Sequence, residues 1–218
     1  MQISEPMTMI TDYLLGAWAL YLASKLLQKG KSIGQRSILF WGLSFIATGM
    51  AALIGGTSHG FALYFGTMTR EVIWISTLYT IGFASLFLLS AAIFATLKNS
   101  LRDWLIAVTA VKFILFAVWI VSHSEFKYVI YDYVPAMIGV LILQAYGKYR
   151  RGDKSAAWII SGILVSFGAA AVQQSGFTLH EHFNNNDLYH VIQMGALFLL
   201  YRGGLLLVDA GDSSRERG

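Results

Sequence analysis

The stretch His180–Leu207, "HEHFNNNDLYHVIQMGALFLLYRGGLLL", decides the class of this protein. Its second half is a nearly continuous apolar run, and a bilayer core of about 30 Å needs about 20 mostly apolar residues in a helix. Its first half places three histidines and two acids within eleven residues. The stretch therefore predicts a membrane-spanning helix with a cluster of ionisable groups at its beginning.

The composition of the whole chain agrees with a membrane protein. Of its 218 residues, 56% are hydrophobic and only 13% are charged, whereas a soluble domain carries about 25% charged residues. The absence of cysteine excludes disulfides, thiolate metal sites and cysteine nucleophiles. The opening residues, "MQISEPMTMITDY", lack the basic region of a signal peptide, so we expect them to form the exposed start of the first span.

Seven segments are long and apolar enough to be spans, and their continuous apolar runs favour helices over a barrel. We therefore predict an all-α integral membrane protein, a seven-transmembrane-helix bundle formed by one domain over residues 1–208, with a polar tail at 209–218. The predicted spans lie near 7–28, 37–60, 71–97, 103–122, 127–147, 156–174 and 187–208.

Lysine and arginine are distributed unequally between the two sides of these spans. Thirteen fall on one side, and only Arg70 and Lys127 fall on the other. Because cytoplasmic loops carry the excess of positive charge, the bias predicts an outside N-terminus and a cytoplasmic C-terminus. The net charge of +4 then reflects the membrane topology, and it predicts no nucleic-acid partner. Short loops and a compact chain favour a bacterial inner membrane. The thirteen are Lys25, Lys29, Lys31, Arg36, Lys98, Arg102, Lys148, Arg150, Arg151, Lys154, Arg202, Arg215 and Arg217.

Every histidine falls at the predicted outer face, together with several acids. Ionisable groups at such depth usually face the interior of a bundle and have a partner. We therefore expect a polar chamber beneath the outer surface, although histidine is also common in ordinary loops. The residues concerned are His59, His123, His180, His182 and His190, with Asp12, Glu71, Asp132 and Asp187.

The last span offers a metal-binding pattern and a competing explanation. Asn186 and His190 are four residues apart and so share one face of a helix, which His182 extends if the helix begins early. Two imidazoles on one helix plus a third from elsewhere would make a zinc site with an open position for water. The alternative is that "FNNND", Phe183–Asp187, only caps the start of the helix.

The second, third and seventh predicted spans resemble those of the alkaline ceramidases, the PAQR receptors and their relatives, the CREST superfamily. Members of this group are heptahelical, and many are hydrolases. Their last span opens with HxxxH and ends in an aromatic-Arg cluster, like "NDLYHVIQMGALFLLYRG" here. Their second span carries Ser-xxx-His, followed by an acid that opens the third. This chain has "GGTSHGF" with His59, and Glu71 lies twelve residues later.

The resemblance implies a zinc-dependent hydrolase acting on a lipid amide or ester at the outer membrane face. His59 and His190 carry over as zinc ligands, but Asn186 replaces the third histidine. His182, or else His180 or Asn186 itself, would complete the set. Zinc would activate water and polarise the scissile carbonyl.

The implied catalytic residues depart slightly from the family pattern. The family serine falls at Gly55, although Ser58 is close to His59 and could stabilise the oxyanion. Glu71 or Asp187 would accept the proton of the zinc-bound water. The expected partners are membrane lipids and a lipid-like substrate.

Two other functions remain open: a non-catalytic ligand-binding or sensor protein of the same fold, and a small-solute transporter. Prolines are too few to favour the broken helices of a transporter. Lys112 lies within the fourth span, where an unpaired charge is costly, so we expect it to pair with Asp132. Asp12 either lines the chamber or lies at the membrane interface.

Overall fold

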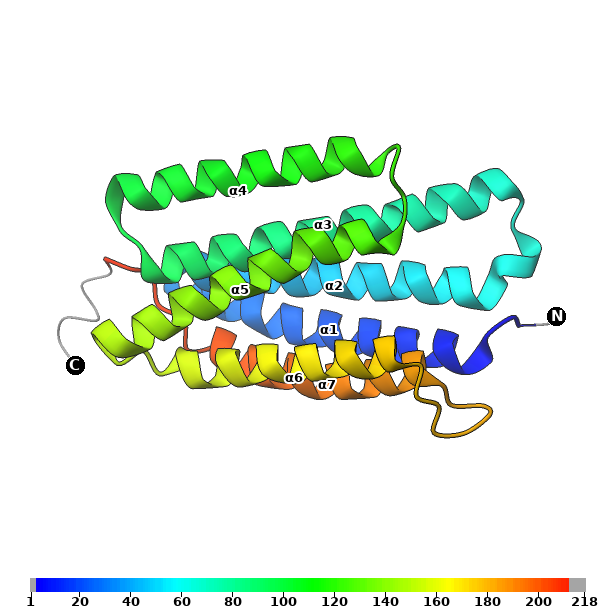
Figure 1. Ribbon diagram of the computed structural model, residues 1–218. Helices are drawn as coiled ribbons and strands as arrows, with labels where there is room; N and C mark the ends of the chain where they lie inside the picture. Colours follow the sequence, from blue (N-terminus) through cyan, green and yellow to red (C-terminus); the bar gives the residue numbers. More distant parts are fainter. Residues whose placement is uncertain (1–2, 212–218) are drawn as a thin grey trace.

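The computed structural model describes residues 3–211, and these fold into seven long α-helices that run side by side (Figure 1). Each predicted span corresponds to one helix, which confirms the all-helical fold. The helices are α1 (Pro6–Ile33), α2 (Arg36–Phe61), α3 (Thr67–Thr96), α4 (Asn99–Ile120), α5 (Phe126–Arg151), α6 (Ser155–Ser175) and α7 (Asn185–Gly204), with a short 3-10 helix, η1 (Ala62–Tyr64), after α2.

Within residues 3–211, five helices, α2 through α6, are long and apolar enough to cross a membrane. The other two fall short because of their polar residues. α1 contains Asp12 and three lysines, and α7 begins with two asparagines and an aspartate. α1 nevertheless has 28 residues and α7 has 20, and α1 packs along both α2 and α7.

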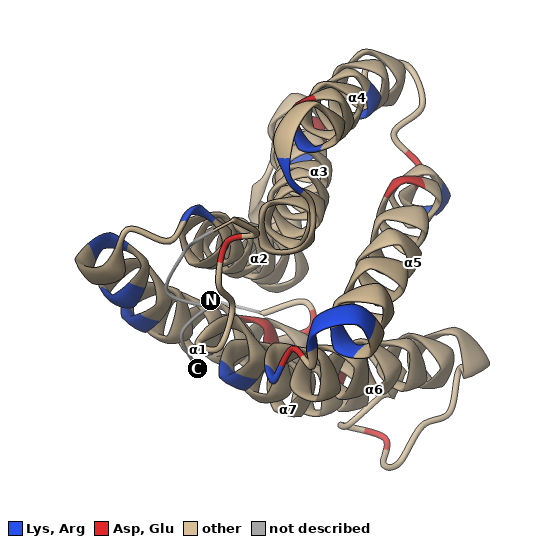
Figure 2. Cartoon of the chain, turned by 90° about the vertical axis from the view of Figure 1, so that its left-hand side faces the viewer, with Lys and Arg blue, Asp and Glu red and all other residues tan. Residues whose placement is uncertain are grey.

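Successive helices are antiparallel, so the bundle has two distinct ends. One end, which we call the basic end, carries the α1–α2, α3–α4 and α5–α6 connections. Figure 2 views the molecule from this end and shows Lys and Arg gathered there. The opposite end, the histidine end, carries the start of α1 and the α2–α3, α4–α5 and α6–α7 connections, with all five histidines in or near them. Arg215 and Arg217 lie outside the described residues.

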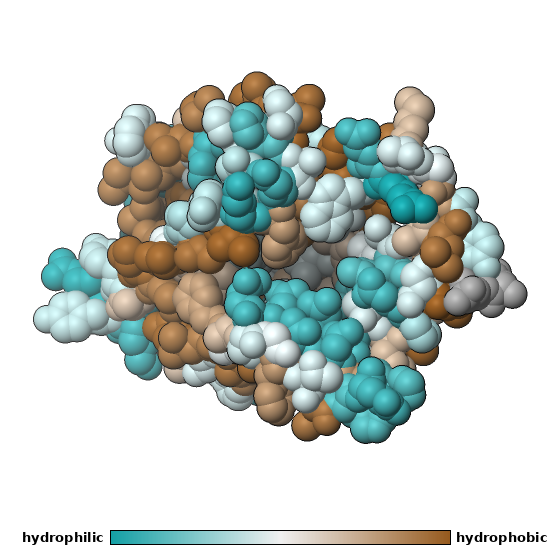
Figure 3. All heavy atoms as spheres, turned by 45° about the vertical axis from the view of Figure 1, so that its right-hand side comes forward, coloured by the Kyte–Doolittle hydropathy of each residue, from teal (hydrophilic) through white to brown (hydrophobic). Residues whose placement is uncertain are grey.

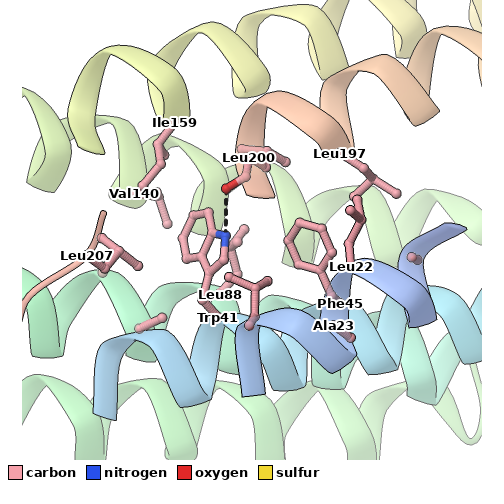
Figure 4. Close-up of a cluster of buried hydrophobic side chains, with 14 of the residues drawn as sticks. Leu22, Ala23, Trp41, Phe45, Leu88, Val140, Ile159, Leu197, Leu200 and Leu207 are labelled. Atoms are coloured by element: carbon pink, nitrogen blue, oxygen red, sulfur yellow. Dashed lines mark hydrogen bonds between the residues drawn. The ribbon is translucent and has the colours of Figure 1, made fainter. Parts of the chain in front are cut away.

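Six helices enclose the core, and α4 lies outside them against α3 (Figure 2). The core toward the basic end contains Trp41, which is fully buried and donates its indole N–H to the carbonyl of Leu200 over 3.0 Å (Figure 4). Small residues let helices approach closely here. A methyl group on Gly203 of α7 would lie 3.1 Å from the carbonyl oxygen of Ser155 on α6.

A partly buried ion pair joins α4 to α5 and confirms the expected partner of Lys112. Its ammonium lies 2.6 Å from the Asp132 carboxylate and also donates to Ser85 of α3 over 2.9 Å. An unpaired Asp132 carboxylate, 6% exposed, would be strongly unfavourable, so the contact with Lys112 stabilises both side chains.

The described part of the polar tail packs onto the bundle. Asp209 accepts the backbone N–H groups of Arg36 and Ser37 over 2.9 and 2.8 Å, and so caps the exposed N-terminus of α2. Ala210 donates its backbone N–H to the carbonyl of Phe94. The chain end therefore helps to fix α2 and α3 at the basic end.

Candidate functional site

A cavity of about 560 Å³ lies between α1, α2, α3, α5, α6 and α7. Its lining residues on α2 run from Ser44 to His59, which at 1.5 Å per residue is about 22 Å along the bundle axis. The deeper part is apolar, with Leu88, Met137 and Leu197 among its walls. The cavity is therefore long, narrow and mostly hydrophobic.

Polar side chains gather where the cavity reaches the histidine end. Figure 3 shows the molecule with this end brought forward, and a hollow bordered below by hydrophilic side chains is visible. α5 and α6 meet at the basic end and diverge toward the histidine end (Figures 1 and 2). The polar lining residues of this end are Asp12, His59, Gln173, Gln174, Asn186, Tyr189, His190 and Gln193.

Asp12 and His190 form the centre of this polar end. The Nε2 atom of His190 lies 3.1 Å from Oδ1 of Asp12, and both side chains are 8% exposed. The other ring nitrogen, Nδ1, lies 2.9 Å from the hydroxyl of Thr11, which sits behind the cavity wall. Both nitrogens of the ring are thus engaged by α1, and its orientation is fixed.

The second oxygen of Asp12, Oδ2, lies near Gly55. Within residues 3–211, Oδ2 has no hydrogen-bond partner, and it lies near Gly55 of α2 and Thr77 of α3. A methyl group on Gly55 would come no closer than 3.9 Å to Oδ2 and 4.0 Å to Thr77 Cγ2. All three residues line the cavity, so Gly55 leaves free volume beside a carboxylate oxygen.

The beginning of α7 is held by a capping box. The Asn184 side chain accepts the backbone N–H groups of Asn186 and Asp187, and Asp187 accepts the backbone N–H of Asn184 over 2.8 Å. Gln173 of α6 donates to the Asn186 side chain over 3.1 Å. The capping interpretation of "FNNND" is confirmed, and Asn186 also lines the cavity.

Comparison with known proteins places the chain in a family. A family described as a family of unknown function, DUF6962, matches residues 7–209. The chain belongs to DUF6962. No curated protein matches it. No solved structure matches it. The match extends from the second residue of α1 to Asp209, so the DUF6962 region includes all seven helices and the residue that caps α2.

No comparison connects this DUF6962 chain with the ceramidase and receptor group, so that resemblance stays a prediction. The structure nevertheless shows where the implied ligands lie. His59 and His190 both line the cavity, as expected. His182 does not: it lies in the α6–α7 loop, 79% exposed, and its Nε2 is 3.4 Å from the Glu181 carboxylate.

The residues present do not fit a three-histidine zinc centre in this arrangement. Within residues 3–211, no group of three or more His, Cys, Asp or Glu side chains is placed to hold a metal ion. His182 is left in the loop because the Asn184 cap starts α7 only at Asn185. His59 uses Nδ1 to contact Glu5, at 3.1 Å.

The predicted catalytic residues lie away from the cavity wall. Ser58, on α2, is not among the residues that line the cavity, and Glu71 is exposed on the first turns of α3. Asp187 is buried, but it serves as a cap. The structure therefore brings His59, His190 and Asn186 to one cavity. Ser58, Glu71 and Asp187 lie outside its lining.

Several lining residues were missed or left open by the sequence patterns. Asp12 was assigned either to the chamber or to the interface, and it lines the cavity. Trp74, Tyr133 and Tyr189 also line it. Aromatic residues near a span end are equally typical of an interfacial belt. Residue type and position in the sequence therefore do not show which of these rings face the cavity.

Proposed function

We propose that this chain is an integral membrane protein of seven spanning helices, with an outside N-terminus and a cytoplasmic C-terminus, that binds a single-chain amphiphile in its cavity. The observation that carries the proposal is the form of the cavity, which is apolar along its depth and polar at one end. Ligand sites of this kind combine hydrophobic walls with a few polar groups that set orientation.

The topology is supported by the lengths and ends of the helices. α1 has 28 residues and α7 has 20, which correspond to about 42 and 30 Å and so match a bilayer core. The basic end carries eleven of the fourteen lysines and arginines within residues 3–211, as cytoplasmic loops do. The polar end of the cavity then lies beneath the outer surface, at the depth of lipid headgroups.

The dimensions of the cavity favour a ligand with one hydrocarbon chain and one head group. Its 560 Å³ falls within the usual range of about 300–1,000 Å³ for small-molecule sites. A chain lying along α3 and α7 would contact Leu88 and Leu197, while its head would lie beside Asp12 and Asn186.

Binding is tested with a tetradecyl-chain amphiphile and native mass spectrometry of the full chain. We expect saturable uptake of one molecule per chain. Gly55→Leu places a side chain in the free volume beside Asp12 and should weaken binding at least tenfold. Gly195→Leu is the matched control, because Gly195 is an exposed α7 glycine with open space around it. Equal affinities of the two variants, or no uptake by the wild type, would refute the proposal.

Hydrolysis of a lipid amide or ester is the second candidate, and the unpartnered Asp12 oxygen favours it. A carboxylate within reach of a ligand can act as a general base, a role that typically contributes 10²–10⁴-fold. The test is release of fatty acid from a tetradecanoyl amide and a tetradecanoyl ester, together with metal analysis of the purified protein. Turnover that Asp12→Asn lowers at least 100-fold would support catalysis, and absence of turnover would leave binding alone.

A further inference from the structure

We infer that the head of the cavity ligand carries a positive charge, an ammonium or quaternary ammonium group, which the Asp12 carboxylate holds beside aromatic rings. The inference rests on the proposed binding of an amphiphile and names the chemistry of its head. Four features of the polar end carry it: the charge of the lining, the free carboxylate oxygen, the aromatic walls and the occupied histidines.

The charge of the lining is acidic. Among the described residues that line the cavity, Asp12 is the single Asp or Glu, and no Lys or Arg is present. A second carboxylate, Asp187, is buried on the same helix as His190 and is 1% exposed. One oxygen of Asp187 has no hydrogen-bond partner within residues 3–211. Two acids with no fixed cation between them favour a positively charged ligand.

The geometry leaves one oxygen of Asp12 available for that ligand. Oδ1 is bound to His190, which holds the carboxylate in one orientation. Oδ2 is directed toward the volume beside Gly55 and Thr77. A head group in this volume would contact a carboxylate oxygen without displacing any existing hydrogen bond.

Aromatic rings also line the cavity. Trp74, Phe126, Tyr133 and Tyr189 all line the cavity toward the histidine end. Trp74 is fixed by an N–H donated to the Ser124 carbonyl over 2.6 Å, and its ring centre lies 6.3 Å from that of Phe126. Aromatic faces attract ammonium groups, most strongly where water is excluded.

The histidines of the lining do not oppose a cationic head. His190 is held between Thr11 and Asp12, so its ring nitrogens face protein groups. His59 contacts the Glu5 carboxylate, which balances any charge on that ring. Both imidazoles are thus engaged by α1 or by the segment that precedes it.

The experiment compares four amphiphiles with the same tetradecyl chain and different heads: trimethylammonium, phosphocholine, maltoside and sulfate. Affinity for the full chain in nanodiscs of neutral lipid is measured for each. We expect trimethylammonium to bind at least tenfold more tightly than maltoside, and sulfate most weakly. Asp12→Asn should reduce the preference for trimethylammonium over maltoside to less than threefold. Glu71→Gln is the matched control, because it removes an exposed carboxylate at the same end.

The outcomes separate this inference from the function on which it rests. Equal binding of all four heads, blocked by Gly55→Leu, would refute the charged head and leave amphiphile binding intact. Tighter binding of the sulfate amphiphile than of the trimethylammonium amphiphile would refute the charged head as well. If none of the four amphiphiles bound, both the charged head and the proposed amphiphile binding would be refuted. The order of the heads on the wild-type chain decides the matter even if Asp12→Asn fails to fold.

Discussion

His190 Nε2 lies 3.1 Å from Asp12 Oδ1 and so joins the last helix of the bundle to the first. The contact is buried, and the same imidazole reaches Thr11 on the other side. It closes the ring of helices around the cavity and orients the carboxylate that faces the cavity. The pair therefore contributes both to stability and to the proposed ligand site.

Removal of His190 should destabilise the bundle as well as the site. His190→Ala leaves Asp12 buried without its partner, and a lost hydrogen bond to a charged group costs about 1.5–3 kcal/mol. Unfolding in a mild detergent measures the effect. In a double-mutant cycle with Asp12→Ala, we expect a coupling of about 0.5–3 kcal/mol between the two positions. Additive effects would show that the contact contributes nothing to the closure of the ring.

The Lys112–Asp132 pair should be strongly coupled because it is the main polar contact between α4 and α5. Lys112→Met alone leaves a buried carboxylate unpaired, at a cost of about 3–5 kcal/mol, whereas the double change to Lys112→Met and Asp132→Leu should recover much of that loss. Thermal unfolding is the measurement. Lys127→Gln is the control, because Lys127 forms an exposed pair with Glu125, 3.2 Å long, and such pairs contribute about 0–1 kcal/mol. Equal shifts for Lys112→Met and Lys127→Gln would contradict the prediction.

The close approach of α6 and α7 should not tolerate an added methyl group at Gly203. Its position near Ser155 and Ile159 leaves no room, and overpacking costs about 1–3 kcal/mol. Gly195→Ala, on the same helix in open space, should instead gain up to about 1 kcal/mol of helix propensity. The two apparent melting temperatures should move in opposite directions. A rise for Gly203→Ala would mean that the helices are not in contact there.

The Asp209 cap should matter for α2 although it lies after the last helix. Asp209→Ala removes the acceptor for two backbone N–H groups at the start of α2, a loss of about 0.5–2 kcal/mol. Asp103→Ala, at an exposed carboxylate, is the control and should change the melting temperature little. Faster hydrogen exchange of the first turn of α2 in Asp209→Ala would locate the effect. Unchanged exchange there would show that the cap contributes nothing.

The fold followed from the sequence because a bilayer fixes the length of apolar runs. Each predicted span overlaps one helix, and the partner of Lys112 was predictable because a buried charge needs one. The helices nevertheless extend beyond the runs, as α1 does to Ile33, because its polar residues Lys29, Lys31 and Ser32 continue the helix past the apolar stretch. Asp209 was assigned to a polar tail because nothing in its composition indicates which N-terminus it caps.

The site was predictable only in part, since spacing along one helix does not show which other helix faces it. His59 and His190 were correctly placed near a common cavity. His182 fits the same face only if α7 starts a turn earlier, and the Asn184 cap prevents that start. The contact between Thr11 and His190 depends on α1 and α7 lying side by side, and no local pattern specifies that arrangement.

The most direct test of the central claim is photo-crosslinking with a tetradecyltrimethylammonium analogue that carries a diazirine near the end of its chain. After irradiation in nanodiscs, mass spectrometry identifies the labelled residues. We predict labelling deep in the cavity, at Leu88, Met137 and Leu197, and loss of that labelling in Gly55→Leu. Labelling confined to the exposed face of α4, at residues such as Leu115 and Val118, would show that the amphiphile remains in the bilayer and would contradict the claim.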